Sequence, residues 1–354
     1  METAAARHHD VRARGVAPLW GVAAGLFLVV AVVVGVLAGA VDLGIGGVLS
    51  SVGDRLHVPG VTTALTPTEE SILWELRLPR VALAALVGGM LASAGATYQG
   101  VFRNPLADPY LLGVAAGAGL GATIAIAYAP DGIRGQRLLP LAAFLGASVA
   151  VVLAYAVGRS AGRARDAATL VLAGVTVASF LTAAQTFVQQ RNTDTLQQVY
   201  SWILGGLPTS GWSDVLLVLP YVALAAAVIV ALRRVVDVLN LGDDEAASLG
   251  VNVRRMRLAL VVAATLGTAA VVAVSGLIGF VGIIVPHTIR LLTGFGYRAL
   301  LPLSLVVGAG FLILADVVAR TVLSPAEIPL GVVTAFVGAP FFAIVLRTSR
   351  VGSR

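Results

Sequence analysis

The sequence of 354 residues contains no lysine and no cysteine, and only 12% of its residues are charged. Without lysine, the chain can form neither a P-loop ATP site nor a lysine Schiff base. Without cysteine, disulfides, thiol nucleophiles and thiolate metal sites are excluded. Any ATP hydrolysis that the protein uses therefore has to come from another chain.

Apolar residues are abundant instead. They make up 58% of the chain, and the mean hydropathy of +0.93 is far above that of a soluble domain. All 24 basic residues are arginines, and they lie between long apolar runs. A nucleic-acid-binding protein would concentrate such charge on a soluble face. We therefore expect an all-α polytopic membrane protein with lipid, and not nucleic acid, as its surroundings.

Nine stretches lack Asp, Glu and Arg and are long enough to be considered as membrane spans of about 20 residues. They are 15–41, 81–102, 109–130, 138–158, 167–190, 215–232, 258–289, 299–315 and 328–346. The stretch 258–289 is too long for one helix without extreme tilt, and it contains Gly276, Gly279, Gly282 and Pro286. A split near Ser275 to Gly279 predicts ten transmembrane helices.

The distribution of arginines predicts the orientation, because short cytoplasmic loops are enriched in basic residues. With ten spans and a cytoplasmic N-terminus, 17 of the 24 arginines lie on the cytoplasmic side. We therefore expect a cytoplasmic N-terminal tail over 1–15, a transmembrane domain over 16–347 with a cytoplasmic loop over 235–256, and a cytoplasmic C-terminal tail over 348–354. The first apolar run is too long for the core of a signal peptide and is interpreted as a retained span.

The cytoplasmic loop after the sixth span predicts a short helix. Its three acidic residues occupy the first turn, where the helix dipole favours negative charge, and Gly250 suits a left-handed C-terminal position. So short a helix is marginal alone in water. It either docks on a partner protein or rests as a solvated loop on its own bundle. The residues concerned are Gly242, Asp243, Asp244, Glu245, Ala246, Ser248, Leu249, Gly250 and Val251.

Three arginines, Arg77, Arg80 and Arg320, are predicted on the outer face, against the usual bias. They have two interpretations. The guanidinium groups receive carboxylates of a docking protein or an anionic substrate. Alternatively, they pair locally, because Arg320 follows Asp316 by four residues and Glu75 precedes Arg77.

Few ionisable groups are predicted inside the membrane, which disfavours a proton or ion pathway. Asp316 is near its predicted partner Arg320, and His287 is alone in its run, so it is expected to make a structural hydrogen bond. Other polar residues either line a wet pathway or link helices. They are Gln99, Thr182, Gln185 and Gln189. Residues 196–206 predict an interfacial helix with Tyr200 and Trp202, which either anchors the chain or gates the outer mouth.

Eight segments carry motifs in a fixed order: 76–80 (Leu-Arg-Leu-Pro-Arg), 99–113 (from Gln99 through Asn-Pro-Leu-Ala-Asp-Pro), 202–206, 248–251, 279–287, 314–316, 325–331 and 338–342. Together they resemble the permease family of type II ATP-binding-cassette importers for ferric siderophores and cobalamin, often called FecCD or BtuC-like. The resemblance covers about residues 70 to 347. Residues 1–69 match only as a first span.

The resemblance implies a BtuC-like permease fold that dimerises, with itself or a related permease, around a central pathway. It also implies two ATPase subunits that bind ATP and magnesium, and an extracytoplasmic substrate-binding protein. On this basis Gly242 to Val251 contacts the ATPase, and Arg77, Arg80 and Arg320 receive glutamates of the binding protein. The chain itself is expected to hold no catalytic residue, cofactor or metal.

The function expected is transport of a ferric siderophore across the bacterial cytoplasmic membrane. Cobalamin or haem is the alternative cargo. A secondary transporter driven by protons or sodium is an alternative of another class, which the scarcity of intramembrane acids disfavours. An intramembrane enzyme is disfavoured because the sequence contains no Gly-x-Ser-x-Gly or His-Glu-x-x-His motif.

Overall fold

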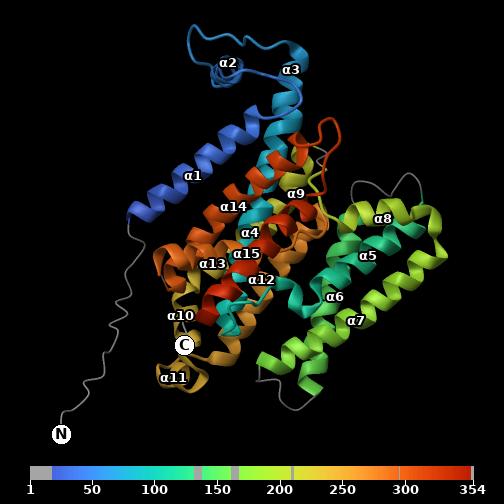
Figure 1. Ribbon diagram of the computed structural model, residues 1–354, viewed down its shortest axis with the longest axis vertical. Helices are drawn as coiled ribbons and strands as arrows, with labels where there is room; N and C mark the ends of the chain where they lie inside the picture. Colours follow the sequence, from blue (N-terminus) through green and yellow to red (C-terminus); the bar gives the residue numbers. More distant parts are fainter. Residues whose placement is uncertain (1–17, 131–137, 161–166, 209–210, 295, 352–354) are drawn as a thin grey trace.

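The computed structural model describes residues 18–130, 138–160, 167–208, 211–294 and 296–351. Within these ranges the chain is helical and contains no β-strand. The long helices run between two ends of the molecule, with α2 and α3 at one end and α10 and α11 at the other (Figure 1). The expected N-terminal tail over 1–15 lies outside the described residues, whereas helix continues to Val351, into the segment expected to be the C-terminal tail.

Each of the ten apolar segments predicted from the sequence contains a helix. They are α1 (Pro18–Leu37), α4 (Leu78–Val101), α5 (Val114–Tyr128), α6 (Leu139–Ser160), α7 (Ala167–Arg191), α9 (Trp212–Ala231), α12 (Val253–Ser275), α13 (Val281–Thr293), α14 (Tyr297–Thr321) and α15 (Leu330–Val351). Among the described residues, 7 helices are long and apolar enough to cross a membrane, and α5, α13 and the apolar part of α15 are shorter. The protein is thus a multi-pass membrane protein, while the number ten remains a prediction.

The predicted split of the longest apolar run is confirmed. Helix α12 ends at Ser275 and α13 begins at Val281. Gly276 and Phe280 both adopt positive φ angles, 66° and 68°, which turn the chain between the two helices. The hydroxyl of Tyr110 donates to the carbonyl oxygen of Ile278 at 3.1 Å and accepts from its N–H at 3.1 Å, which satisfies the backbone where the helix is broken.

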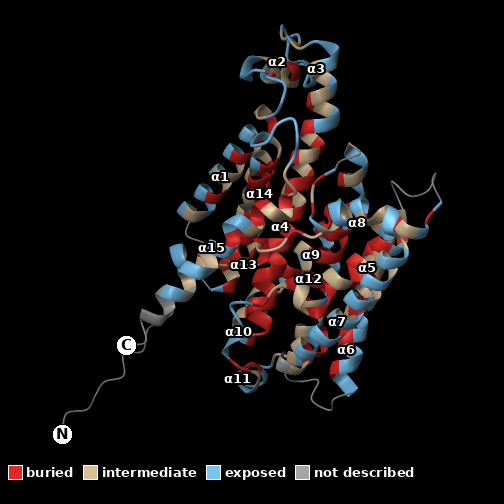
Figure 2. Cartoon of the chain, turned by 45° about the vertical axis from the view of Figure 1, so that its right-hand side comes forward, coloured by how far each residue is buried: buried red, intermediate tan, exposed pale blue. Residues whose placement is uncertain are grey.

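Helix α4 lies at the centre of the molecule and is mostly buried (Figure 2). It packs against α14 and α13 at positions where glycine removes the side chain. A Cβ atom at Gly88 would collide with the carbonyl oxygen of Gly308, and one at Gly95 would collide with that of Gly282. Close backbone approach of this kind is typical of helix packing in membranes.

Helix α7 exposes hydroxyl side chains as well as apolar ones. The outer helices α1, α6 and α9 expose mainly apolar side chains, as expected of surfaces that face lipid. Exposed examples are Leu26 on α1, Val152 on α6 and Leu224 on α9. The apolar surface of these helices would be unstable in water, which supports a membrane location.

Short helices connect the long ones. Helix α2 (Ile45–Arg55), α3 (Pro67–Ser71) and the π-helical turn η1 (Ile72–Arg77) form one end, and α10 (Arg233–Leu241) and α11 (Asp243–Ser248) form the other (Figure 1). The 3-10 turns η2 (Pro109–Leu112) and η4 (Thr193–Thr195) precede α5 and α8. Helix α8 (Leu196–Ile203) coincides with the predicted interfacial helix, and Tyr200 on it is exposed.

Candidate functional sites

Helices α10 and α11 form a compact unit at one end of the bundle. Val236 and Leu239 of α10 and Ala246 of α11 are fully buried, so the unit rests on the bundle through its apolar side chains. The three acidic residues of α11 lie in its first turn, as predicted. The unit is therefore a fixed part of the fold, and not a free loop.

Two carboxylates fasten this unit to the transmembrane helices. Asp237 accepts the backbone N–H of Tyr297 at 2.5 Å and that of Arg298 at 3.0 Å, which caps the first turn of α14. Asp243 pairs with Arg257 of α12 at 2.7 Å and with Arg103 at 3.4 Å. Hydrogen bonds from Arg257 lower the pKa of Asp243 below its ordinary value. A displacement of α11 would thus be transmitted directly to α12 and, through α10, to α14.

The surface of α11 that faces away from the bundle combines charge and apolar side chains. Asp244 and Glu245 are exposed, as is Ser248, and Leu241 and Leu249, on either side of the helix, are 65% and 63% exposed. Gly250 adopts the predicted left-handed conformation, with φ of 80°, and its N–H bonds to the carbonyl of Ala247. This face of the α10–α11 unit is therefore accessible and carries both acidic and leucine side chains.

The three outer arginines are all engaged within the chain. Arg80 pairs with Asp316 and with the exposed Glu327, each at 2.8 Å. Arg320 pairs with Asp316 at 3.3 Å and donates to the carbonyl of Gly35 at 2.6 Å. The local pairing of Arg320 with Asp316 that the spacing predicted is therefore present. Hydrogen bonds from Arg80 lower the pKa of Glu327.

Arg77 is only 6% exposed and holds the end of α1. Its guanidinium group donates to the carbonyls of Val36 and Leu37, each at 2.9 Å, and to that of Val41. Val36 and Leu37 are the last two residues of α1 and Val41 follows it, so these carbonyls have no partner within the helix. The sequence offered Glu75 as the local partner of Arg77, whereas the structure gives it backbone carbonyls about 40 residues away.

The polar residues predicted to line a pathway divide into two groups. Gln99 is fully buried, donates to the carbonyl of Gly282 at 3.1 Å and accepts from Arg290, so it links α4 to α13. Gln185 is also buried, where its side chain packs against Gly119. Gln189 is half-buried and Thr182 is exposed. His287 lies edge-on against the ring of Phe341, with ring centres 5.8 Å apart.

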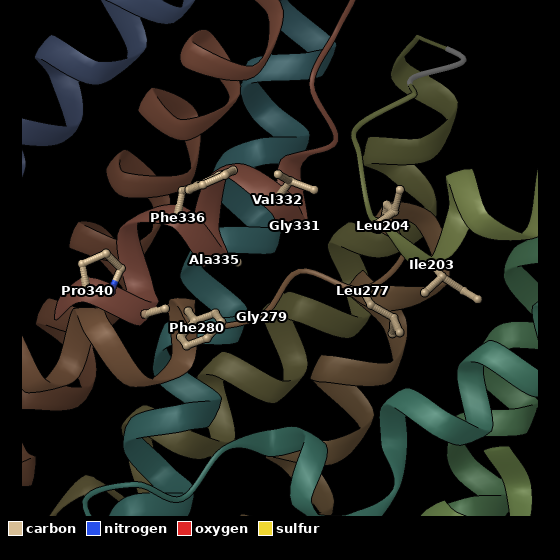
Figure 3. Close-up of a pocket in the computed structure, with 11 residues that line it drawn as sticks. Ile203, Leu204, Leu277, Gly279, Phe280, Gly331, Val332, Ala335, Phe336 and Pro340 are labelled. Atoms are coloured by element: carbon tan, nitrogen blue, oxygen red, sulfur yellow. The ribbon is translucent and has the colours of Figure 1, made fainter. Parts of the chain in front are cut away.

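Sequence reasoning missed two pockets. The larger, of about 610 Å³, is apolar and lies where α8, the α12–α13 connection and α15 meet (Figure 3). Beside it the backbones bond directly, since Leu330 and Gly331 donate to the carbonyls of Gly205 and Leu204. The glycines at positions 205 and 331 were the sequence signal for this close backbone contact, because a Cβ on Gly331 would collide with the carbonyl of Leu204.

The smaller pocket, of about 450 Å³, lies between η2 and α7 and is lined by Asp108, Tyr110, Leu111, Val175, Ala178, Ser179 and Thr182. It brings the predicted pathway residue Thr182 into one pocket with Asp108, which lies between the predicted spans 81–102 and 109–130. No group of three or more potential metal ligands occurs in the described part of the chain. The smaller pocket instead joins one carboxylate, that of Asp108, with the hydroxyls of Tyr110, Ser179 and Thr182.

Comparison with known proteins decides the family. The FecCD transport family matches residues 27–348 of this chain. The chain belongs to the FecCD transport family. It is therefore a permease component of ATP-binding-cassette importers, multi-pass and all-helical, and the resemblance seen in the sequence motifs is confirmed.

Individual FecCD relatives differ in cargo. The chain is 38% identical over 331 residues to the ABC transporter permease protein YvrB of Bacillus subtilis, covering 93% of each chain. It is 42% identical to the cobalamin import permease BtuC of Halobacterium salinarum, covering 80% of this chain and 75% of that one. It is 36% identical to the Fe(3+) dicitrate transport permease FecC of Escherichia coli, covering 83% and 87%.

A solved structure of a metal-chelate type ABC transporter in an inward-facing conformation superimposes with a TM-score of 0.80 at 28% identity. The match covers 94% of this chain and 99% of that one. This FecCD protein therefore shares the whole fold of that transporter chain.

Proposed function

We propose that this FecCD protein is the membrane subunit that imports a ferric siderophore across the bacterial cytoplasmic membrane. The observation that carries the proposal is the family match over residues 27–348, together with relatives named for Fe(3+) dicitrate and Fe(3+)-hydroxamate import. Cobalamin is the second candidate cargo, because the relative named for cobalamin import is 42% identical. Haem is a third chemical class that the same test includes.

The proposed arrangement has ten crossings with both termini in the cytoplasm. The three shorter apolar helices supply the additional crossings, with neighbouring turns completing their length. The end formed by α10 and α11 then faces the cytoplasm, and the end formed by α2 and α3 faces outward (Figure 1). Seventeen arginines on the cytoplasmic side support this orientation.

In the proposed mechanism, ATP and magnesium bind to two partner ATPase subunits and this chain supplies no catalytic residue or cofactor. The residues from Gly242 to Val251 receive the movement of the ATPase. The contacts of Asp237 and Asp243 described above would pass it to α14 and α12. A second permease subunit, identical or related, would complete the pathway that opens alternately to the two sides.

The proposal also includes a binding protein that docks on the outer end. Arg80 and Arg320 would receive its carboxylates by exchanging them for Asp316 and Glu327. Glu327 is the exposed member of this ion network, with 53% of its side chain accessible. For Arg77, docking would additionally require release of three carbonyls at the end of α1.

Uptake by cells tests the cargo. Cells that lack this gene should lose uptake of labelled ferric siderophore and regain it with the native gene, and only when the partner ATPase is functional. Restored uptake of cobalamin or haem in place of the iron chelate would overturn the siderophore assignment. Restored uptake without the ATPase would overturn the mechanism.

A further inference from the structure

Asp108 is a carboxylate at the depth of the membrane interior. The pocket that it lines includes Ser179, the central residue of α7, which spans Ala167–Arg191. A helix of this length is about 37 Å long and exceeds the hydrocarbon core, so its central residue lies near the middle of the bilayer. Helix α5 is too short to cross alone, and the η2 turn capped by Asp108 precedes it inside the bundle. Ionisable groups at this depth are costly and usually serve a function.

One carboxylate oxygen of Asp108 is structural and the other is not. Oδ1 accepts the N–H of Tyr110 at 2.8 Å, which caps η2. Oδ2 lies beside the first turn of α13, where a Cβ on Gly282 would be 3.4 Å from it. Among the interactions of the described residues, no hydrogen bond or ion pair engages Oδ2. The cap of η2 therefore accounts for Oδ1 of Asp108 but gives no role to Oδ2.

The polar atoms of the pocket are mainly acceptors. The hydroxyl of Ser179 donates its proton to the carbonyl of Val175 at 2.9 Å, which leaves its oxygen lone pairs free to accept. The hydroxyl of Tyr110 both donates to and accepts from the backbone of Ile278, so it is occupied. Ser179 and Thr182 are exposed, and the pocket is open on the side of α7.

We propose that Asp108, Ser179 and Thr182 form a cargo-contact site that accepts an ammonium or another hydrogen-bond-donating group and disfavours anionic groups. This inference rests on the proposed function, since the contact would be made during passage. A carboxylate and two hydroxyl oxygens facing a shared space attract cations and donors, and the weak screening inside the membrane strengthens the effect. Asp108 would thus help to choose among chelates of different charge.

Thiol labelling tests the site directly, because the native chain has no cysteine. Ser179→Cys, in the assembled importer in membrane vesicles, is treated with methanethiosulfonates that carry either trimethylammonium or sulfonate. The reactivity ratio is the rate with the cationic reagent divided by the rate with the anionic one. We expect this ratio to be high for Ser179→Cys, and adding Asp108→Asn should lower it about tenfold. Asn retains an oxygen that accepts the N–H of Tyr110, so the cap of η2 is preserved.

Thr186→Cys is the matched control, since Thr186 is exposed on the same helix and does not line the pocket. Its reactivity ratio should respond much less to Asp108→Asn. A Ser179→Cys protein that reacts with neither reagent would overturn the inference, as would a ratio that Asp108→Asn leaves unchanged. A shift of equal size at both positions would also overturn it.

Import in the same vesicles then tests selectivity for cargo. The probes are a ferric trihydroxamate with a free terminal amine and the same chelate with that amine acetylated. Asp108→Asn should reduce import of the amine form relative to the acetylated form, and an unchanged ratio would overturn the cargo contact. If the native importer carries neither chelate, the siderophore assignment fails, whereas the labelling result still decides the charge preference of the pocket.

Discussion

Asp316→Asn is expected to lower the free energy of unfolding by about 3 kcal/mol or more. The Asp316 side chain is 2% exposed and accepts from Nε and Nη2 of Arg80 while it pairs with Arg320. Removing its charge leaves two largely buried guanidinium groups with only Glu327 to balance them. Breaking a buried ion network is costly because the remaining charges stay desolvated. Thermal unfolding of the detergent-solubilised protein, followed by size-exclusion chromatography, measures the effect.

Asp243→Asn is the matched control for stability, because Asp243 also pairs with two arginines but is 38% exposed. Exposed ion pairs contribute about 1 kcal/mol or less. The Asp316 variant should therefore unfold at a clearly lower temperature than the Asp243 variant. Equal unfolding temperatures would contradict the structural role of the ion network at the outer end.

Glu245→Arg is expected to reduce ATP-driven uptake about tenfold or more while the protein remains inserted and folded. Glu245 is exposed on α11, so reversing its charge changes the surface offered to a partner with little effect on the bundle.

Gly250→Val tests the same surface by adding an apolar side chain next to α11. The φ of 80° at position 250 costs a residue with a side chain about 1–2 kcal/mol, but no atom lies within 4 Å of the added Cβ. Copurification with the ATPase and uptake measure both variants.

Asp194→Arg provides the control, since Asp194 is an exposed acid in η4, directly before α8, and α8 lies well away from α11 (Figure 1). It carries the same charge change and should leave ATPase copurification unchanged. Native levels of copurification and uptake in the Glu245 and Gly250 variants would remove the ATPase contact from α11.

The helical architecture could be predicted from the sequence because apolar runs of this length, separated by arginines, leave few alternatives to membrane-spanning helices. The helix break after Ser275 could be predicted because the apolar stretch 258–289 is too long for one span and contains several glycines. The first turn of α11 could be predicted from three consecutive acidic residues. These signals are local. Membrane helices must satisfy their backbone internally, so local hydropathy nearly determines where they lie.

The functional details were harder to predict because they depend on distant partners. Arg77 bonds to carbonyls about 40 residues away, and the motif that contains it indicates only an arginine at an outer end. Asp108 lies between the predicted spans 81–102 and 109–130, a position that indicates a connection at the membrane surface. The structure instead folds this segment back against the middle of α7, and no periodicity in the sequence encodes that return.

Reconstitution tests the central claim most directly. The permease and its partner ATPase are placed in liposomes with ATP on the ATPase side, and the binding protein delivers labelled ferric siderophore to the other side. The account predicts accumulation that requires both ATP and the ATPase, and that is indifferent to an imposed proton or sodium gradient. Accumulation driven by such a gradient in liposomes that contain the permease alone would contradict it.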